Sequence, residues 1–214
     1  MAYSYKSSQD AAACLDQELV AAGFNVTSYF LDVTDAKAVT QLAVRVEQEI
    51  GPVDVLVNNA GVAQVLPFVM IEEEDWDHMM DVNLKSMFLA TKAFVRGMIR
   101  RKSGTIINMG SLAGVRMLEV PVHYAAAKSA VTGFTLALAR ELGRYNIRVN
   151  AVVPGMLDEG VSVNVPAKQR QQYESYCALS RVGTCEEVAQ VVAFLASKRS
   201  SYLNGQSIQV DGGI

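Results

Sequence analysis

The chain has 214 residues, of which 50% are hydrophobic and 19% charged, and its formal net charge is −3 at pH 7. These values fit one α/β domain with a sizeable core, and they give no sign of a nucleic-acid partner. The polar opening segment and the lack of a long apolar run lead us to expect a cytoplasmic protein without a membrane anchor. Cys14, Cys177 and Cys185 do not have zinc-site or disulfide spacing, so we expect no metal ion.

Apolar periodicity predicts strands that alternate with helices along the first half of the chain. A strand over 2–5 precedes a helix over 7–22, which Gly23 ends. A strand over 25–33 precedes a second helix, capped by Thr34 or Asp35, that runs to about residue 50. Residues 53–57 form a short apolar strand, and 73–101 are predicted to be helical in two pieces.

The second half continues this alternation. It predicts strands over 105–109, 148–153 and 207–210 and helices over 124–145 and 184–197, whereas the more polar residues 156–180 receive no element. Strands that alternate with helices of this length are typical of βαβ units. We therefore predict a single α/β domain over residues 1–214 with a doubly wound, mostly parallel sheet.

Three residues in the second half have side chains suited to proton transfer. Ser111 follows the strand over 105–109, Tyr124 comes thirteen residues later, and Lys128 comes four residues after that. Tyr124 and Lys128 would lie one turn apart on one helix face. An ammonium beside a phenol stabilises the phenolate and lowers a pKa that is otherwise near 10. A serine hydroxyl from the neighbouring strand would orient a carbonyl oxygen towards that phenol.

Each of these motifs also has an ordinary explanation. A Tyr-x-x-x-Lys alone is more often a helix-surface pair, and a lone histidine such as His123 is more often packed or exposed than a second acid. The other ordinary explanations are a turn serine for Ser111, a solvent-facing side chain for Asn83, a turn residue for Asn59, a helix N-cap for Asp32 and a surface lysine for Lys6.

In their order and spacing, these motifs resemble the short-chain dehydrogenase/reductase family. They are Asn58-Asn59-Ala60-Gly61, Asn83, Ser111, Tyr124-x-x-x-Lys128 and Pro154-Gly155. The resemblance covers nearly the whole chain and is strongest to 3-oxoacyl-(acyl-carrier-protein) and acetoacetyl-CoA reductases. It implies a Rossmann-like fold, a homo-oligomer (dimer or tetramer) and NAD(P)H-dependent reduction of a small or carrier-bound carbonyl substrate. The more specific expectation is a 3-oxoacyl thioester of fatty acid or polyketide metabolism.

The resemblance also implies a role for each site residue. Tyr124 would protonate the developing alkoxide, Ser111 would orient the oxygen, and Asn83 would hold a water of the proton relay. Lys128 would lower the phenol pKa and bind the nicotinamide ribose, so Tyr124 and Lys128 both border the cofactor. The other expected cofactor residues are Asp32 and Val33 beside the adenine, Asn59, Ala60 and Gly61 after the third strand, and Pro154, Gly155 and Leu157 beside the nicotinamide. Lys6 lies where NADP-preferring members place a cation, which favours NADP over NAD.

The chain departs from the family pattern at two places. The phosphate-binding turn of the family reads roughly Thr-Gly-x-x-x-Gly-x-Gly, but here no glycine precedes Gly23, and Glu159 replaces a usual threonine. We therefore expect the first strand and helix of the fold to be absent, which would leave two sheet edges unpaired. Either strands shift to close the gap, or that part is loose, or the sequence is a truncated or processed fragment, which is the explanation we favour. A different function stays open, that of a non-catalytic subunit that assembles with an intact paralogue.

A cluster of cations raises one more hypothesis. Lys102 aligns with a position at which carrier-protein reductases meet the acidic carrier, and Arg144 lies near another such position. The ordinary explanation is a group of cations at a helix C-terminus, where the helix dipole favours them.

Overall fold

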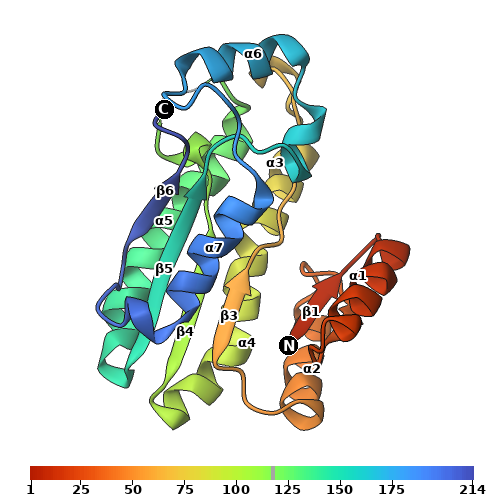
Figure 1. Ribbon diagram of the computed structural model, residues 1–214, viewed down its shortest axis with the longest axis vertical. Helices are drawn as coiled ribbons and strands as arrows, with labels where there is room; N and C mark the ends of the chain where they lie inside the picture. The colour runs from red at the N-terminus through yellow and green to blue at the C-terminus, as the bar shows by residue number, and fades with distance from the viewer. Residues whose placement is uncertain (117–118) are drawn as a thin grey trace.

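The computed structural model describes residues 1–116 and 119–214 as strands and helices of an α/β fold (Figure 1). The strands are β1 (Ala2–Tyr5), β2 (Thr27–Phe30), β3 (Val55–Asn58), β4 (Gly104–Met109), β5 (Ile147–Pro154) and β6 (Ser207–Val210). The helices are α1 (Gln9–Ala21), α2 (Ala36–Glu49), α3 (Glu73–Met80), α4 (Ser86–Arg101), α5 (Val122–Leu142), α6 (Ala167–Tyr176) and α7 (Cys185–Ala196).

The strands form two parallel sheets. β1 pairs with β2 in a two-stranded sheet, and the other strands form a four-stranded sheet in the order β3-β4-β5-β6. Figure 1 shows β1 with α1 and α2 standing apart from β3. The predicted α/β class with parallel strands is confirmed. β1 and β3 do not pair with each other and each keeps one unpaired edge, as we expected where a strand of the fold is absent, and the strands have not shifted to close the gap.

The core lies on the two faces of the larger sheet. Ile106 and Val149 pack with residues of α4 and α5, whereas Ile107 and Val152 pack with residues of α7. All four have 0% of their surface exposed. Neighbouring residues of β4 and β5 thus alternate between two covered faces, which explains their unbroken apolar sequence. This doubly wound arrangement holds the carboxyl ends of β4 and β5 rigidly.

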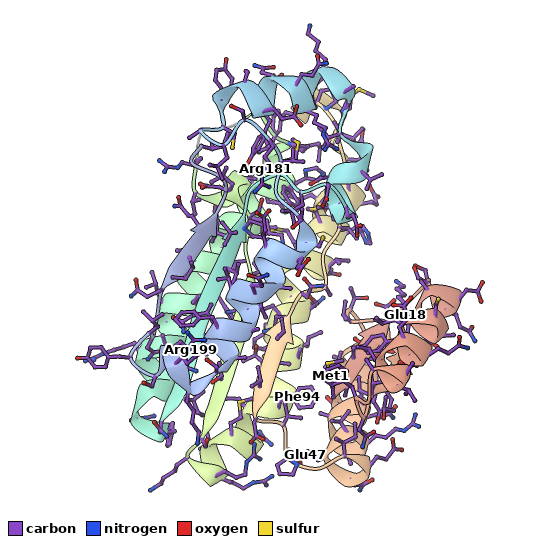
Figure 2. All side chains as sticks on the ribbon, in the orientation of Figure 1. Met1, Glu18, Glu47, Phe94, Arg181 and Arg199 are labelled. Carbon is purple, nitrogen blue, oxygen red and sulfur yellow. The ribbon has the colours of Figure 1, made fainter. Side chains whose placement is uncertain are left out.

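The smaller sheet is attached to the larger one through helices. α2 packs against α4, and a methyl group at Gly97 of α4 would lie only 2.6 Å from the Glu47 carboxylate of α2. Figure 2 labels Glu47 of α2 and Phe94 of α4, which lie where the part with the smaller sheet meets the part with the larger one. The β3 edge is half exposed, with Val55 at 36% and Val57 at 40%. A helix contact, and no strand pairing, therefore joins the two sheets.

The local sequence explains where the elements begin and end. Asp35 caps α2 by accepting hydrogen bonds from the backbone amides of Lys37 and Ala38. The predicted two-piece helix over 73–101 consists of α3 and α4, joined by a π-helical turn over Asp81–Lys85. α6 was not predicted, because its polar sequence AKQRQQYESY has no apolar stripe.

Candidate active site

The three candidate proton-transfer residues lie at the carboxyl end of the larger sheet. Ser111 follows β4, and Tyr124 and Lys128 lie in the first two turns of α5. The Lys128 ammonium nitrogen is 3.1 Å from the carbonyl oxygen of Met109, the last residue of β4, and 6.0 Å from the Tyr124 ring centre. Ligands of open parallel sheets bind at this end, where loops from several strands converge.

Asn83 is held in place by the π-helical turn between α3 and α4. Its side-chain amide donates to the carbonyls of Val62 at 3.0 Å and Met79 at 3.1 Å, and its oxygen accepts from the Val62 amide at 3.2 Å. With 1% of its surface exposed, Asn83 is not a solvent-facing residue. Single π-helical turns are frequent at functional sites, because the extra residue turns a side chain out of the helical register. Here Asn83 fixes the loop after β3.

Gly61 lies between Asn83 and Lys128. A methyl group at residue 61 would lie 3.0 Å from the Asn83 side-chain oxygen and 3.4 Å from the Lys128 ammonium nitrogen. The loop backbone therefore passes close to both groups, and only glycine leaves this space open. This close approach brings the predicted Asn59-Ala60-Gly61 segment to the same place as the proton-transfer residues.

Burial shifts the pKa values of both members of the Tyr124–Lys128 pair. Lys128 is 6% exposed, and burial lowers its pKa to about 8. Burial also raises the pKa of Tyr124, and a hydrogen bond from Ser111 opposes part of this rise. We expected Lys128 to lower the tyrosine pKa, but burial is the largest effect on this pKa and raises it. Tyr124 is therefore protonated near neutral pH, the form in which a phenol can donate a proton.

The Ser111 hydroxyl accepts a hydrogen bond from the backbone and can donate another. It precedes the short helix Leu112–Gly114, and its oxygen accepts a hydrogen bond from the Ala113 amide at 3.2 Å. Because that bond uses only a lone pair, the hydroxyl proton can be donated to a second partner, which here is the Tyr124 oxygen. The turn-serine explanation is thus correct for the oxygen and leaves the predicted role of the proton open.

Further predicted cofactor residues surround this end of the sheet. Asn59 and Ala60 are exposed just beyond β3. Pro154 is the last residue of β5, and Gly155 and Leu157 follow it. A methyl group at Gly155 would displace the Tyr173 hydroxyl of α6 and would lie 3.0 Å from the Cα atom of Asp211, so the backbone passes close to both residues here. Glu159 lies near the start of α7, where its charge contributes to a raised Cys185 pKa after the larger effect of burial.

The predicted adenine-side residues lie on the smaller sheet and bind one another. The Lys6 ammonium nitrogen is 2.6 Å from an Asp32 carboxylate oxygen, and the Thr34 amide and hydroxyl donate to the other oxygen at 2.9 and 2.7 Å. The Lys6 hydrogen bond, followed by those of Thr34, lowers the Asp32 pKa to about 2. Asp32 is not the helix N-cap, since Asp35 fills that position. Val33 follows Asp32 and is partly buried.

A series of buried hydrogen bonds between polar side chains beneath the site was not predicted from the sequence. The Asn58 amide donates to Thr91 at 3.1 Å and to Asn108 at 2.8 Å, and Asn108 donates to Thr135 at 2.9 Å. This series of hydrogen bonds links β3 and β4 with α4 and α5 through side chains that are at most 9% exposed. Asn108 within an apolar strand was the available signal, because a buried amide requires partners.

The structure places the two cations of the carrier-docking hypothesis, which stays a prediction. Lys102 ends α4, and Asn146 donates a hydrogen bond to its carbonyl, so Lys102 and Arg144 lie together where α4 and α5 end. Tyr124 lies near the other end of α5, which at 1.5 Å per residue is about 30 Å long. These cations therefore lie far from Tyr124 of their own chain, and docking of a carrier on them stays a prediction.

Comparison with known proteins gives a consistent result over nearly the whole chain. A family model described as enoyl-(acyl carrier protein) reductase matches residues 2–214. The chain is similar to the 3-oxoacyl-[acyl-carrier-protein] reductase FabG of Thermotoga maritima, with 43% identity over 88% of this chain and 77% of that protein. FabG of Pseudomonas aeruginosa is 36% identical over 97% of this chain and 84% of its own length. A gluconate 5-dehydrogenase from Burkholderia cenocepacia J2315, solved in complex with NADP and tartrate, superposes with a TM-score of 0.92 at 30% identity, covering 99% of this chain and 83% of that one.

The fold and these relatives define the class of protein. Parallel strands with a serine, a tyrosine and a buried lysine at their carboxyl end are the framework of a Rossmann-like oxidoreductase. The chain belongs to the short-chain dehydrogenase/reductase family, as its motifs indicated. In the described residues, 1–116 and 119–214, no helix has both the length and the apolar character needed to cross a bilayer.

Proposed function

We propose that the protein uses NADPH to reduce the ketone of a 3-oxoacyl thioester to a 3-hydroxyacyl thioester. The observation that carries this proposal is the placement of the Tyr124 phenol, the Ser111 hydroxyl and the Lys128 ammonium at one end of the sheet. The names of the similar reductases from Thermotoga maritima and Pseudomonas aeruginosa support the 3-oxoacyl substrate. The NADP complex of the similar dehydrogenase supports the cofactor.

The residues present fit the nicotinamide half of such a cofactor. Lys128 donates to Met109 and retains two N–H donors for ribose hydroxyls, and the space at Gly61 is one that a methyl group would fill. Asn59, Ala60, Pro154, Gly155 and Leu157 would border this half, whereas Lys6, Asp32 and Val33 would border the adenine. The glycine-rich turn that holds the pyrophosphate in the family has no counterpart among the described residues, since no glycine precedes Gly23.

When bound, the reduced cofactor would supply a hydride to the ketone carbon. Tyr124 donates its phenolic proton to the developing alkoxide, and Ser111 donates a hydrogen bond that holds the same oxygen. Lys128 stabilises the phenolate that remains. Asn83 keeps the loop after β3 in place. Its side-chain amide already donates hydrogen bonds to the carbonyls of Val62 and Met79, so the water that we expected at Asn83 would have to bind another of its atoms.

The pKa of Lys128 predicts how the rate depends on pH. Because burial lowers this pKa to about 8, the ammonium is largely charged near neutral pH and loses its proton as the pH rises through that value. Ketone reduction consumes a proton, so both the Lys128 charge and the protonated Tyr124 favour the lower side of this range. We expect kcat for reduction to fall as the pH rises through about 8, which a pH–rate profile measures.

A titration of the 214-residue chain tests the proposal directly. Nucleotide fluorescence would be followed as NADPH is added, with NADH in parallel, and turnover of acetoacetyl-CoA would then be measured at saturating cofactor. Micromolar NADPH binding together with turnover supports the proposal. No binding up to millimolar nucleotide would refute it for this polypeptide. The alternative of a non-catalytic subunit has no support in the names of the relatives.

We also propose that the protein forms a homo-oligomer. Phe88 of α4 is 45% exposed and Leu136 of α5 is 53% exposed, and both helices cover the same face of the larger sheet. Exposed apolar side chains on long helices are suited to pairing with a second copy. Light scattering coupled to gel filtration measures the mass, and a monomer at micromolar concentration would contradict this proposal.

A further inference from the structure

His123 is a buried titratable residue next to Tyr124 that the proposed reaction does not use. It has 0% of its surface exposed and lies in the first turn of α5. Its Nε2 is 3.1 Å from the side-chain oxygen of Gln64, and its Nδ1 has no hydrogen-bond partner among the described residues. Such a residue calls for an explanation, because an imidazole with one unpaired nitrogen is costly to bury.

Gln64 connects His123 to the start of α3. Its side-chain amide nitrogen donates to Asp75 at 2.6 Å, and the other Asp75 oxygen accepts from the Glu72 amide at 3.2 Å. These two hydrogen bonds, of which the Gln64 bond is the stronger cause, lower the pKa of Asp75. Asp75 is therefore ionised near neutral pH and only accepts hydrogen bonds.

The ionised Asp75 determines which atoms of Gln64 and His123 donate and which accept in these hydrogen bonds. Since the carboxylate can only accept, the Gln64 NH₂ group must face it, and the Gln64 oxygen must face His123. That oxygen is also only an acceptor, so His123 Nε2 must carry the proton. His123 is then a neutral imidazole with a bare Nδ1. Burial lowers its pKa, and Asp75, the charged group acting on it, opposes this shift only in part.

The hydrogen bonds from Asp75 through Gln64 to His123 join the start of α3, the loop after β3 and the start of α5. Gln64 lies two residues after Val62, which Asn83 holds by both backbone groups. The same loop carries the Asn59-Ala60-Gly61 segment. His123 immediately precedes Tyr124, so a displacement of the start of α5 would displace the phenol. Gln64 therefore links the loop after β3 to the residue beside the proton donor.

We propose that Asp75, Gln64 and His123 form a positioning relay that holds the loop after β3 against the start of α5 and so fixes Tyr124 with respect to Ser111. The relay requires the Nε2–H tautomer of His123. Its kinetic consequence depends on the proposed reductase function, but its tautomer does not. None of the three side chains is assigned contact with substrate or cofactor, so they are positioning residues and not catalytic ones.

Nitrogen-15 NMR of the imidazoles tests the relay in the intact protein. The chain has two histidines, and His78 is exposed, so His78→Gln assigns the spectrum. We expect His123 to give the Nε2–H tautomer and to stay neutral over about pH 6–8, where exposed histidines titrate. The Nδ1–H tautomer, or a titration that matches that of His78, would overturn the proposal.

Kinetics of matched variants test the positioning role. Gln64→Leu and His123→Leu each break the relay, and we expect kcat to fall about tenfold, with KM for NADPH nearly unchanged, because small displacements of reacting groups are costly. His123→Gln restores a donor and should recover most of kcat, while Gln48→Leu on the exposed side of α2 serves as the control. Wild-type kcat in folded Gln64→Leu and His123→Leu would overturn the proposal. A wild-type protein without turnover would refute the reductase function alone, and the NMR result would still decide the relay.

Discussion

β4 and β1 are both parallel strands beside helices, yet they differ in how much surface they bury. Ile106 and Ile107 of β4 are fully buried on opposite faces of the larger sheet, whereas β1 alternates between exposed and partly buried residues. Phe30 of the neighbouring β2 is 70% exposed. The larger sheet, which forms the larger unit with its helices, thus has fully buried residues on both faces. The smaller sheet, which forms the smaller unit, is contacted by α1 through Ser28 and by α2 through Tyr29, but more of its surface stays exposed. Most of the stability should come from the larger sheet.

The proposed chemistry follows the same division. Asn83, Ser111, Tyr124 and Lys128 all lie on the larger unit, whereas Lys6 and Asp32 lie on the smaller one. A proton donor must be held within a fraction of an ångström, which requires a rigid scaffold. Residues that border the far end of a cofactor tolerate more movement. The difference between the two units implies that substitutions on the larger one act on turnover and those on the smaller one act on affinity.

The largest expected effect of a single substitution is on turnover. Tyr124→Phe removes the only proton that the phenol can donate, and a general acid contributes about 10²–10⁴-fold to a rate. We therefore expect kcat to fall by about 10²–10⁴-fold with little change in NADPH affinity. Tyr202→Phe is the matched control, since Tyr202 is fully exposed. Full activity in Tyr124→Phe would remove the phenol from the mechanism.

The next effect concerns global stability. Ile106→Ala leaves a cavity in the centre of the larger sheet and should lower the free energy of unfolding by about 2–5 kcal/mol. Phe30→Ala removes a larger side chain from the smaller unit, but we expect a change of only about 0.5 kcal/mol because that side chain is mostly exposed already. Urea unfolding of both variants measures the difference. Equal losses would mean that Phe30 is covered in solution.

Two helix caps provide a smaller and closely matched comparison. Asp35 caps α2 in the smaller unit, and Thr184 caps α7 in the larger one, in both cases through a side-chain oxygen. Replacing either residue by alanine should cost about 1 kcal/mol. In hydrogen exchange, we expect Asp35→Ala to speed exchange in α1 and α2 alone, and Thr184→Ala to lower protection throughout the larger unit. If both variants changed protection everywhere, the chain would behave as the one domain expected from its sequence.

Sequence patterns predicted the regular parts of this molecule because local periodicity fixes them. The strand over 207–210 and the pairing of Ser111 with Tyr124-x-x-x-Lys128 depend on spacing alone, and they were predictable. The sequence also indicated two open strand edges, but it did not indicate whether strands would shift to close them, because strand pairing depends on which distant edges meet. The His123–Gln64 contact joins residues 59 positions apart, and no local pattern signals such a contact. α6 lacks an apolar stripe, so periodicity gave no sign of it.

The smallest expected effect comes from Lys6 on the smaller unit. Lys6→Met removes the largest cause of the low Asp32 pKa, so this pKa should rise from about 2 towards its usual range while staying below it, because Thr34 still donates two hydrogen bonds. A lowered folded-state pKa means that the pairing stabilises the protein above the unfolded value of about 3.9, and that this contribution is lost as the pH falls through the folded pKa.

Since Lys6 and Asp32 are both partly exposed, the stability change near neutral pH should stay below about 1 kcal/mol. A carbon-13 titration of the Asp32 carboxyl measures the pKa, with Lys37→Met on exposed α2 as the control. The same variant should weaken NADPH binding more than NADH binding, because only NADPH carries the 2′-phosphate that a cation would favour. If the affinities for NADPH and NADH fell equally, Lys6 would bind only Asp32 and would not select NADPH over NADH.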